Sequence, residues 1–274
     1  MTLVDLQVRH DYNAQLEFYD ETPHPGPILV KQPDDEDLEE DDEDYGEQHD
    51  WYYDGVYLIL ASFPFPRFRP ADVLLPYDDP ATIFDIIPKK VFVNGVMLYY
   101  KRAWILEDSA RAIEKYQKIL ASGHPPEELR TSRLYGIVID SRGVLCGLLC
   151  HWIDVQNHLT WDVLDASTEE SRTKWMEQIQ GTVSILHGPG ICWGNVQPTD
   201  VVIDSADNTI ITDLKGGASK GWIDKDNMDT LGGDLQRMER LIDYITNDQC
   251  LLRVEDKKFD LELEQEASGQ GQQI

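Results

Sequence analysis

The sequence of 274 residues predicts an α+β fold. Three pairs of β-prone runs are each joined by a short polar turn, and the segments between the pairs carry apolar residues at helical spacing. A further helical segment follows the last pair. Because the strands come as hairpins separated by helices, they are expected to form segregated antiparallel sheets rather than one parallel sheet.

Composition and charge limit the class of protein. The chain has a net charge of −27 and a hydrophobic content of 41%, typical of a soluble globular protein. No run approaches the roughly 18 apolar residues of a membrane span, and the N-terminus lacks a basic region followed by an apolar stretch, so neither a membrane association nor a secretory signal is expected. The four cysteines form no Cys-x-x-Cys pair, which predicts reduced thiols and a cytoplasmic or nuclear location.

An acidic run occupies residues 34–44, DDEDLEEDDED, and holds ten acidic side chains. Such a run repels itself and cannot pack, so it is expected to be disordered. Its simplest interpretation is a solvating tether, and the alternative is a segment that binds a basic protein, such as a histone tail. No basic stripe opposes this acidity, so nucleic acid is not an expected partner.

Regular elements begin after an aromatic and proline-rich stretch. In VFVNGVMLYYK (91–101), Asn94-Gly95 separates two β-prone runs and predicts a tight hairpin. Residues 105–120 are expected to form a helix, because the apolar residues Ile113, Tyr116 and Leu120 recur on one face. A second hairpin turns at Ser141-Arg142-Gly143.

The second half of the chain continues the alternation. A helix is expected to begin near Thr168, where Glu169 and Glu170 favour a helix N-terminus, and to end at the sequence HGPG, 187–190. A third hairpin joins 201–203 to 209–212. A last helix follows, and the tail after about Lys257 is expected to be polar and frayed. The apolar stripes of the two helices are Trp175, Ile179, Val183 and Leu186, and then Leu231, Leu235, Met238, Leu241, Ile242 and Ile245.

The candidate site residues lie at the ends of these elements. Lys101 ends a strand, and Glu114 lies inside the following helix at a spacing that permits an ion pair. The loop ICWGNVQPTD (191–200) contains Asn195 and, five residues later, Asp200. The next strand ends at Asp213, in the sequence Asp-Leu-Lys-Gly-Gly.

In this order, these residues resemble the protein kinase-like family, and in particular the small divergent kinase-like proteins frequent in filamentous fungi. The resemblance covers roughly 85–246 and implies a two-lobed fold with a truncated large lobe. It divides the chain into six segments. These are an N-terminal extension (1–33), an acidic linker (34–50), an aromatic segment docking on the core (51–84), a small lobe (85–154), a large lobe (155–246) and a polar tail (247–274).

The resemblance also implies roles for single residues. Lys101 would neutralise nucleotide phosphates and be held by Glu114, while Asp200 and Asp213 would bind Mg²⁺. The segment 148–154 would be the hinge that grips an adenine, with Leu149 and Trp152 as nucleotide contacts. Asp234, in the last helix, would brace the catalytic loop from below. ATP and Mg²⁺ are therefore the implied cofactors.

The sequence departs from the kinase pattern at several positions. Asn195 stands where the catalytic base is an aspartate, and Asp200 stands where the metal ligand is an asparagine. A neutral amide cannot take the substrate proton. Lys215 replaces a glycine and could compete with the metal for Asp213. A Gly-x-Gly-x-x-Gly loop is absent before Lys101, and few residues follow the last predicted helix, so a protein substrate is less expected than a small molecule or none.

Three interpretations of function remain open. The first is a nucleotide-binding pseudokinase or weak phosphotransferase. The second is a non-catalytic interaction module that uses the acidic and aromatic N-terminal region. The third is an active, divergent kinase that tolerates the exchanged Asn195 and Asp200. A fourth interpretation concerns the site alone: its asparagines and aspartates could be turn formers in an unrelated α+β protein, because such side chains satisfy local backbone groups.

Overall fold

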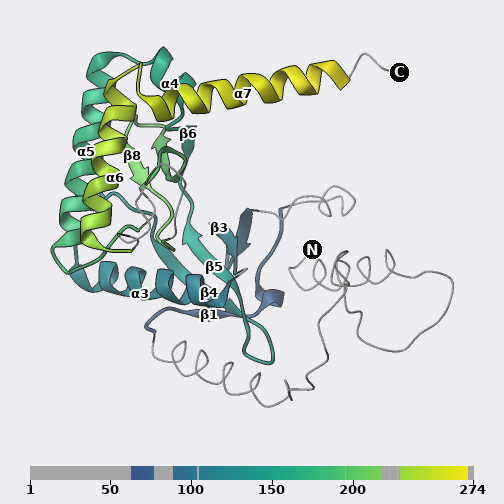
Figure 1. Ribbon diagram of the computed structural model, residues 1–274. Helices are drawn as coiled ribbons and strands as arrows, with labels where there is room; N and C mark the ends of the chain where they lie inside the picture. Colours follow the sequence, from purple (N-terminus) through teal and green to yellow (C-terminus); the bar gives the residue numbers. More distant parts are fainter. Residues whose placement is uncertain are drawn as a thin grey trace, which may run out of the picture.

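The computed structural model describes residues 63–76, 89–103, 105–194, 196–216, 222, 227 and 229–270, with side chains up to residue 262 in the last helix. Within these residues the fold is α+β, as predicted. A five-stranded sheet and a three-stranded sheet are separate, and helices pack beside both (Figure 1). The division into a kinase-like small lobe at 85–154 and large lobe at 155–246 stays a prediction.

The five-stranded sheet has the order β1-β4-β5-β3-β2. Its strands are β1 (Arg67–Phe68), β2 (Lys90–Val93), β3 (Val96–Arg102), β4 (Leu134–Ile139) and β5 (Leu145–His151). The predicted hairpin at Asn94-Gly95 is confirmed, and both residues have positive φ angles, of 51° and 78°. Positive φ angles at both central residues are typical of a type I′ turn, whose twist matches that of the two strands that it joins.

The aromatic segment contributes to this sheet. Strand β1 pairs in parallel with β4, and the 3-10 helix η1 (Pro70–Asp72) follows it. Leu74 then bridges to Phe92 of β2. The described part of the aromatic segment, 63–76, therefore pairs with two strands of this sheet. The acidic run 34–44 and the extension 1–33 lie outside the described residues.

The three-stranded sheet has the order β6-β7-β8 and consists of β6 (Val155–His158), β7 (Val201–Asp204) and β8 (Thr209–Ile211). The third predicted hairpin is confirmed, and β6 is a strand that the sequence analysis did not predict. The turn between β7 and β8 depends on Asp204, whose carboxylate accepts the backbone N–H groups of Ala206 and Asn208 at 2.9 and 2.8 Å. Here the turn-forming interpretation of the aspartates is correct.

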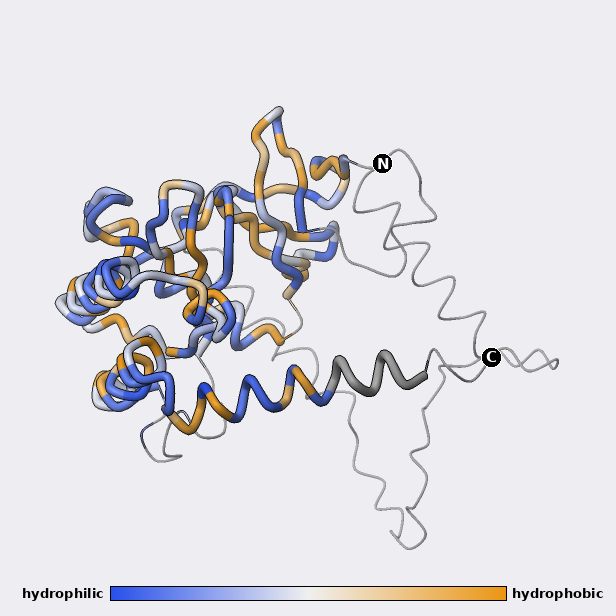
Figure 2. Tube along the Cα trace, turned by 90° about the horizontal axis from the view of Figure 1, so that it is seen from above, coloured by the Kyte–Doolittle hydropathy of each residue, from blue (hydrophilic) through white to orange (hydrophobic). Residues whose placement is uncertain are grey.

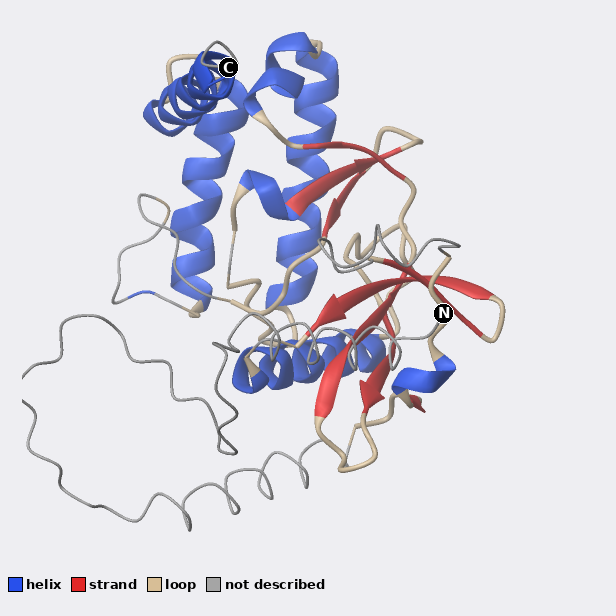
Figure 3. Ribbon diagram, turned by 90° about the vertical axis from the view of Figure 1, so that its right-hand side faces the viewer, coloured by secondary structure: helices blue, strands red, loops and turns tan. Residues whose placement is uncertain are grey.

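Three long helices surround the sheets: α3 (Leu106–Ser122), α5 (Glu169–His187) and α6 (Leu231–Thr246). Thr168 and Thr230 cap the last two, each accepting a backbone N–H three residues on. Helices α5 and α6 lie side by side, and α3 crosses near their lower ends against the five-stranded sheet (Figures 1 and 3). The short 3-10 helix η3 (Pro198–Asp200) precedes β7.

The C-terminal part of the chain differs from the expectation of a frayed polar tail. A short helix, α4 (Trp161–Ala166), contacts a 20-residue helix, α7 (Leu251–Gln270). Arg253 of α7 is buried and paired with Asp165 and Asp248, which anchors the first turns of this helix. Contacts continue to Asp260, which accepts from the Trp161 indole at 2.6 Å, and the C-terminal part of α7 extends away from the other elements (Figure 1). Polar and apolar residues alternate irregularly along the coloured part of the helix (Figure 2).

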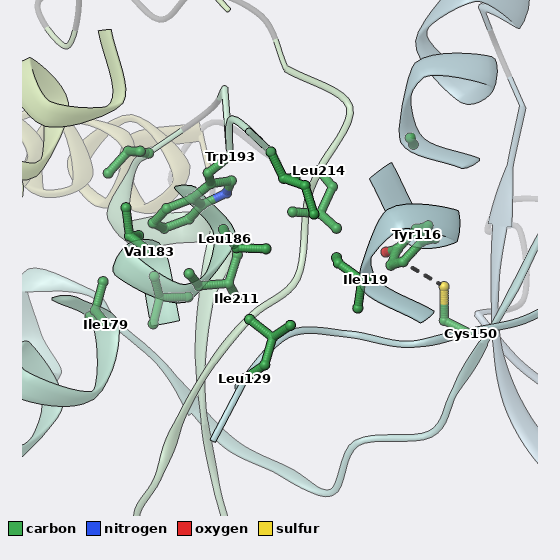
Figure 4. Close-up of a cluster of buried hydrophobic side chains, with 14 of the residues drawn as sticks. Tyr116, Ile119, Leu129, Cys150, Ile179, Val183, Leu186, Trp193, Ile211 and Leu214 are labelled. Atoms are coloured by element: carbon green, nitrogen blue, oxygen red, sulfur yellow. Dashed lines mark hydrogen bonds between the residues drawn. The ribbon is translucent and has the colours of Figure 1, made fainter. Parts of the chain in front are cut away.

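One large hydrophobic cluster joins the two sheets. It includes Ile113 and Leu148 on the side of the five-stranded sheet. On the side of the three-stranded sheet it includes Ile179 and Ile211 (Figure 4). A second, smaller cluster lies on the opposite face of the five-stranded sheet. Three predicted core positions are wrong: Leu120 and Leu235 are each 57% exposed and Leu231 is 38% exposed. Ile119 of α3 and Asp234 and Arg237 of α6 are buried instead. The remaining predicted positions of the α5 stripe are buried.

No helix in the described part of the chain is both long enough and apolar enough to cross a membrane. All four cysteines carry free thiols.

Candidate functional site

Strand β3 carries Lys101 to the face of the sheet that α3 covers. Lys101 pairs with Leu148 of β5, and Leu148 belongs to the large hydrophobic cluster beneath α3. Side chains alternate along a strand, so Tyr100 and Leu98 lie in the cluster on the opposite face. The alternation of β3 therefore directs Lys101 towards the part of the molecule that contains α3 and the end of β8.

Asp213 follows β8 and contacts Lys101. Lys101 Nζ donates to Asp213 Oδ1 at 2.7 Å, although the residues are 112 positions apart. Lys215 Nζ lies 3.4 Å from Asp213 Oδ2, and the Lys215 backbone N–H donates to Oδ1 at 3.0 Å. Burial opposes ionisation of Asp213, but the attraction of Lys101 and these hydrogen bonds outweigh it and hold the pKa of Asp213 below its usual range.

Asp200 lies beside Asp213 because its backbone is tied to the end of β8. The backbone carbonyl of Asp200 accepts from the N–H and the hydroxyl of Thr212, at 2.9 and 3.0 Å, and the Gln197 amide donates to Asp200 Oδ2 at 2.8 Å. Burial raises the pKa of Asp200 to about 6, and the charge of Asp213 contributes to the rise, against the opposing effects of Gln197, Lys101 and Lys215. Two neighbouring carboxyl groups with separated pKa values are typical of functional sites.

Asp234 supports the loop 191–194 from within α6. Its side chain is 1% exposed, and its carboxylate accepts the backbone N–H groups of Trp193 at 2.6 Å and Gly194 at 2.8 Å. His187 Nε2, at the end of α5, lies 3.0 Å from the same carboxylate. The Trp193 indole in turn donates to the backbone carbonyl of Asp213 at 2.8 Å. The loop is thus fixed both to α6 and to the segment that carries Asp213.

Two glycines allow this loop and the segment after Asp213 to approach each other. Gly194 and Gly216 have φ angles of 83° and 84°, which favour glycine. A Cβ on either glycine would clash with the carboxylate of Asp229, and one on Gly194 would lie 3.0 Å from Gly216 Cα. Lys115 of α3 donates to the Trp193 carbonyl at 3.3 Å. Its pKa is lowered by burial, despite the opposing charges of Asp229 and Asp234.

The structure brings together Lys101, Asp200, Asp213 and Lys215, with Asp234 beneath the loop, but it does not bring Glu114 to Lys101. Glu114 is exposed on α3, because the buried face of that helix consists of Ser109, Ala112, Ile113, Tyr116 and Ile119. Lys101 forms its ion pair with Asp213 instead. The expected ion pair between Lys101 and Glu114 is therefore wrong for this conformation. Asn195 lies outside the described residues.

The two expected nucleotide contacts on the hinge differ from each other. Leu149 is fully buried in the small hydrophobic cluster, on the face of the sheet opposite to Lys101. Its side chain is therefore not accessible to a ligand beside Lys101. Trp152 follows β5, is partly exposed, and has Lys90 Nζ 5.3 Å from the centre of its ring.

Sequence reasoning missed three residues around the site, which are Asp108, Lys115 and Tyr99. Asp108 lines a cavity of about 110 Å³ between β3 and α3, together with Lys101, Leu148 and Lys215. Asp108 of α3 therefore lies on the same side of the helix as Lys101. Its place in the first turn of the helix is the sequence feature that could have marked it as a site residue. Lys115 contacts the loop, and the charge of Asp213 contributes to raising the pKa of Tyr99, after the larger effects of burial and of Cys150. The sequence pattern contains no signal for these two contacts.

The donor set of the site fits a hard cation only in part. Asp200 and Asp213 supply carboxylate oxygens, which Mg²⁺ prefers, and Mg²⁺ is often held by one or two carboxylates together with substrate phosphates. Among the described residues no group of three or more His, Cys, Asp or Glu side chains could hold a metal ion. The site therefore fits Mg²⁺ bound jointly with phosphates better than Mg²⁺ bound alone.

Comparison with models of known protein families gives no match, and comparison with curated protein sequences gives no significant one.

Proposed function

We propose that the chain is a divergent protein kinase-like protein that binds ATP and Mg²⁺ beside Lys101, Asp200 and Asp213, and that it is a pseudokinase or a weak phosphotransferase. In kinases, a lysine on a strand of the small-lobe sheet binds the phosphates. Acidic or amide side chains on the catalytic loop, and after the hairpin that follows it, hold the metal ions. In support of the proposal, Lys101 lies on a strand of the five-stranded sheet, and Asp200 and Asp213 lie before and after the β7–β8 hairpin.

The observation that carries the proposal is the contact between Lys101 and Asp213. Lys101 lies on the five-stranded sheet, and Asp213 lies two residues after the last strand of the three-stranded sheet. Their ion pair of 2.7 Å is only partly shielded from solvent, because the Lys101 side chain is 35% exposed. A third charged group, Asp200, is held next to it with a raised pKa. Turn chemistry explains Asp204, which binds its own hairpin, but it does not explain why the carboxyl groups of Asp200 and Asp213 lie together beside two lysines.

In the proposed complex each residue has a defined task. Asp200 and Asp213 would hold Mg²⁺, which would neutralise developing charge on the phosphates. Lys101 would exchange its contact with Asp213 for one with the phosphates. Because Asp200 is ionised only above its raised pKa, metal binding at pH 6 or below would release a proton from it.

Two features favour slow transfer over efficient catalysis. Asn195, at the base position, can accept a hydrogen bond but cannot take a proton, and general-base assistance is worth about 10²–10⁴-fold. Lys215 places a second ammonium at 3.4 Å from Asp213, where it competes with a metal ion for that carboxylate.

A thermal-shift titration with ATP, with and without Mg²⁺, tests the proposal on the full chain. A ligand at about 100 times its dissociation constant stabilises a protein by roughly 2.7 kcal/mol, which corresponds to several degrees in Tm. We expect a Mg²⁺-dependent shift in the wild type, loss of that shift in Asp213→Ala, and its retention in Asp140→Ala, a turn aspartate of the β4–β5 hairpin. A shift without Mg²⁺ would assign the role of the metal to Lys215. Absence of any shift at millimolar ATP would overturn the proposal.

Phosphotransfer is tested separately with Asn195→Asp. Restoring an aspartate at the base position should raise a low rate of ATP turnover by about 10²-fold or more, since general-base assistance is worth about 10²–10⁴-fold. A wild-type rate typical of efficient kinases would favour the active-kinase interpretation instead.

A non-catalytic interaction module is the second candidate. The observation that favours it is that both lysines contact Asp213, so that its carboxylate is already compensated by protein charge. In that case the kinase-like part is a scaffold, and residues 34–44 or the aromatic segment recruit a basic protein. Deletion of 34–44 would then abolish capture of a basic partner, while Asp213→Ala would leave it unchanged.

A further inference from the structure

A cavity of about 450 Å³ lies apart from the site described above. It is bounded by the C-terminal end of α3, the loop that follows it, the start of β4, the residues after β5, and Ile210 of β8. None of its lining residues belongs to the group Lys101, Asp200, Asp213 and Lys215. The cavity is therefore a separate feature of the molecule, which the proposed nucleotide site does not use.

The side chains that remain accessible in this cavity are mainly apolar. Leu120 and Pro126 are exposed, and Ile153 and Ile210 are half-buried. Leu120 lies on the predicted apolar stripe of α3 and is nevertheless 57% exposed, because it lines this cavity rather than the core. Exposed apolar residues that gather in one hollow indicate a docking site, since an occupant that removes them from water gains hydrophobic free energy.

The polar groups of the lining offer an occupant little to bind. The hydroxyls of Tyr116 and Ser132 bond to each other at 2.6 Å, and Ser132 also donates to the Thr212 carbonyl. Arg133 Nη2 donates to two backbone carbonyls of the loop that follows α3. No acidic residue lines the cavity. The occupant that fits these walls is therefore one that presents apolar side chains, with no charged group to be satisfied.

The described part of the chain starts beside this cavity. Phe65 lines it, and Phe63 is buried in the large hydrophobic cluster. The sequence immediately before Phe63 is WYYDGVYLILAS (51–62), in which VYLILA (56–61) is an uninterrupted apolar run. An extended residue spans about 3.3–3.6 Å, so a run that ends only a few residues before Phe65 can reach the other walls of the cavity.

We propose that this cavity is a docking site for the chain's own apolar run 56–61, which covers Leu120, Ile153 and Ile210. The run has the chemistry that the walls require, and its covalent attachment close to Phe65 makes the docking intramolecular, with a short loop to close. The acidic run 34–44, with its ten acidic side chains, cannot enter apolar walls. Docking would anchor the N-terminal region at the end of α3. The proposal does not depend on nucleotide binding.

Limited proteolysis of the full chain with chymotrypsin, followed by mass spectrometry, tests the proposal. This protease accepts large apolar side chains, so it can cleave after Tyr57, Leu58 and Leu60. Cleavage of a docked segment follows the small population that is undocked. We therefore expect these three bonds to be cleaved at least about tenfold more slowly in the full chain than in a synthetic peptide of residues 51–62.

Leu120→Asp places a charge in the cavity and should raise the rate of this cleavage about tenfold, while its exposed position allows the variant to fold. The matched control is Leu235→Asp. Leu235 is also 57% exposed, but it lies on α6, outside the cavity, and this variant should be cleaved as slowly as the wild type. The proposal is overturned if the wild type is cleaved as fast as the peptide, or if the two variants are cleaved alike. Protection that disappears on dilution would also overturn it, because the run of a second copy would then occupy the cavity.

Discussion

Asp234 and the pair Asp200–Asp213 are two buried carboxylate regions that contact the same loop, and they differ in how their charge is satisfied. Asp234 accepts two backbone N–H groups and lies within hydrogen-bond distance of His187. Asp213 instead contacts two partly exposed lysine side chains and only one backbone N–H group, that of Lys215. The Asp200 carboxylate accepts from the Gln197 amide. Fixed backbone donors make a rigid support, whereas mobile lysines can be exchanged for a ligand. The difference distinguishes a structural carboxylate from candidate ligand-binding ones.

The largest expected effect is on Asp234. Asp234→Ala leaves two buried backbone N–H groups unpaired and should lower the free energy of unfolding by about 3–4 kcal/mol. Urea denaturation measures the loss. Asp234→Asn, which retains one acceptor oxygen, should lose less. A loss below about 1 kcal/mol for Asp234→Ala would show that the loop does not depend on this carboxylate.

The next effect is the pH dependence that Asp200 confers. Its pKa is raised from the ordinary 3.8 to about 6, so the folded state holds the proton more tightly, and this residue makes the protein less stable as pH rises from about 4 to about 6. The full difference corresponds to on the order of 3 kcal/mol. The stability difference between Asp200→Asn and the wild type should therefore grow in favour of the variant across this window. Equal pH profiles would contradict the raised pKa.

A smaller effect is expected for the ion pair between Lys101 and Asp213. Lys101→Met should lower the free energy of unfolding by about 1 kcal/mol, because partly exposed pairs contribute little. Lys101 holds the pKa of Asp213 down, so the pair stabilises the protein above the ordinary pKa of an aspartate and less so as pH falls through the lowered one. The variant should lose less stability on acidification than the wild type. A parallel acid profile would show that Lys215 alone suffices.

The smallest expected effect is that of changing Glu114, which the kinase resemblance pairs with Lys101 and which the structure leaves exposed. Glu114→Gln should change stability by less than about 0.5 kcal/mol, since exposed substitutions usually do, and should leave any ATP-dependent thermal shift unchanged. Asp108→Asn is the matched change on the side of α3 that faces Lys101. If Glu114→Gln abolished the ATP shift while Asp108→Asn retained it, Lys101 would change partners when the nucleotide binds.

Much of the local structure could be predicted from the sequence. The Asn94-Gly95 turn, the helix containing Ile113 and Tyr116, and the start of a helix near Thr168 follow from backbone preferences, helix-end charge and apolar periodicity, which operate within a few residues. The order of Lys101, Asp200, Asp213 and Asp234 was also visible. The strands β1 and β6 were missed because they are short and pair with distant segments, so that no local pattern marks them.

The sequence by itself determined the α+β class, the hairpins, the long helices and the polar residues that could form a site. The tertiary structure decided which of these residues meet. The spacing of Lys101 and Glu114 permits an ion pair, but the side of α3 that packs against the sheet leaves Glu114 exposed. Asp213, which follows β8, contacts Lys101 instead. Packing also left Leu120 facing a cavity and set Asp200 beside another carboxylate. Such outcomes depend on contacts across many residues, which no short pattern encodes.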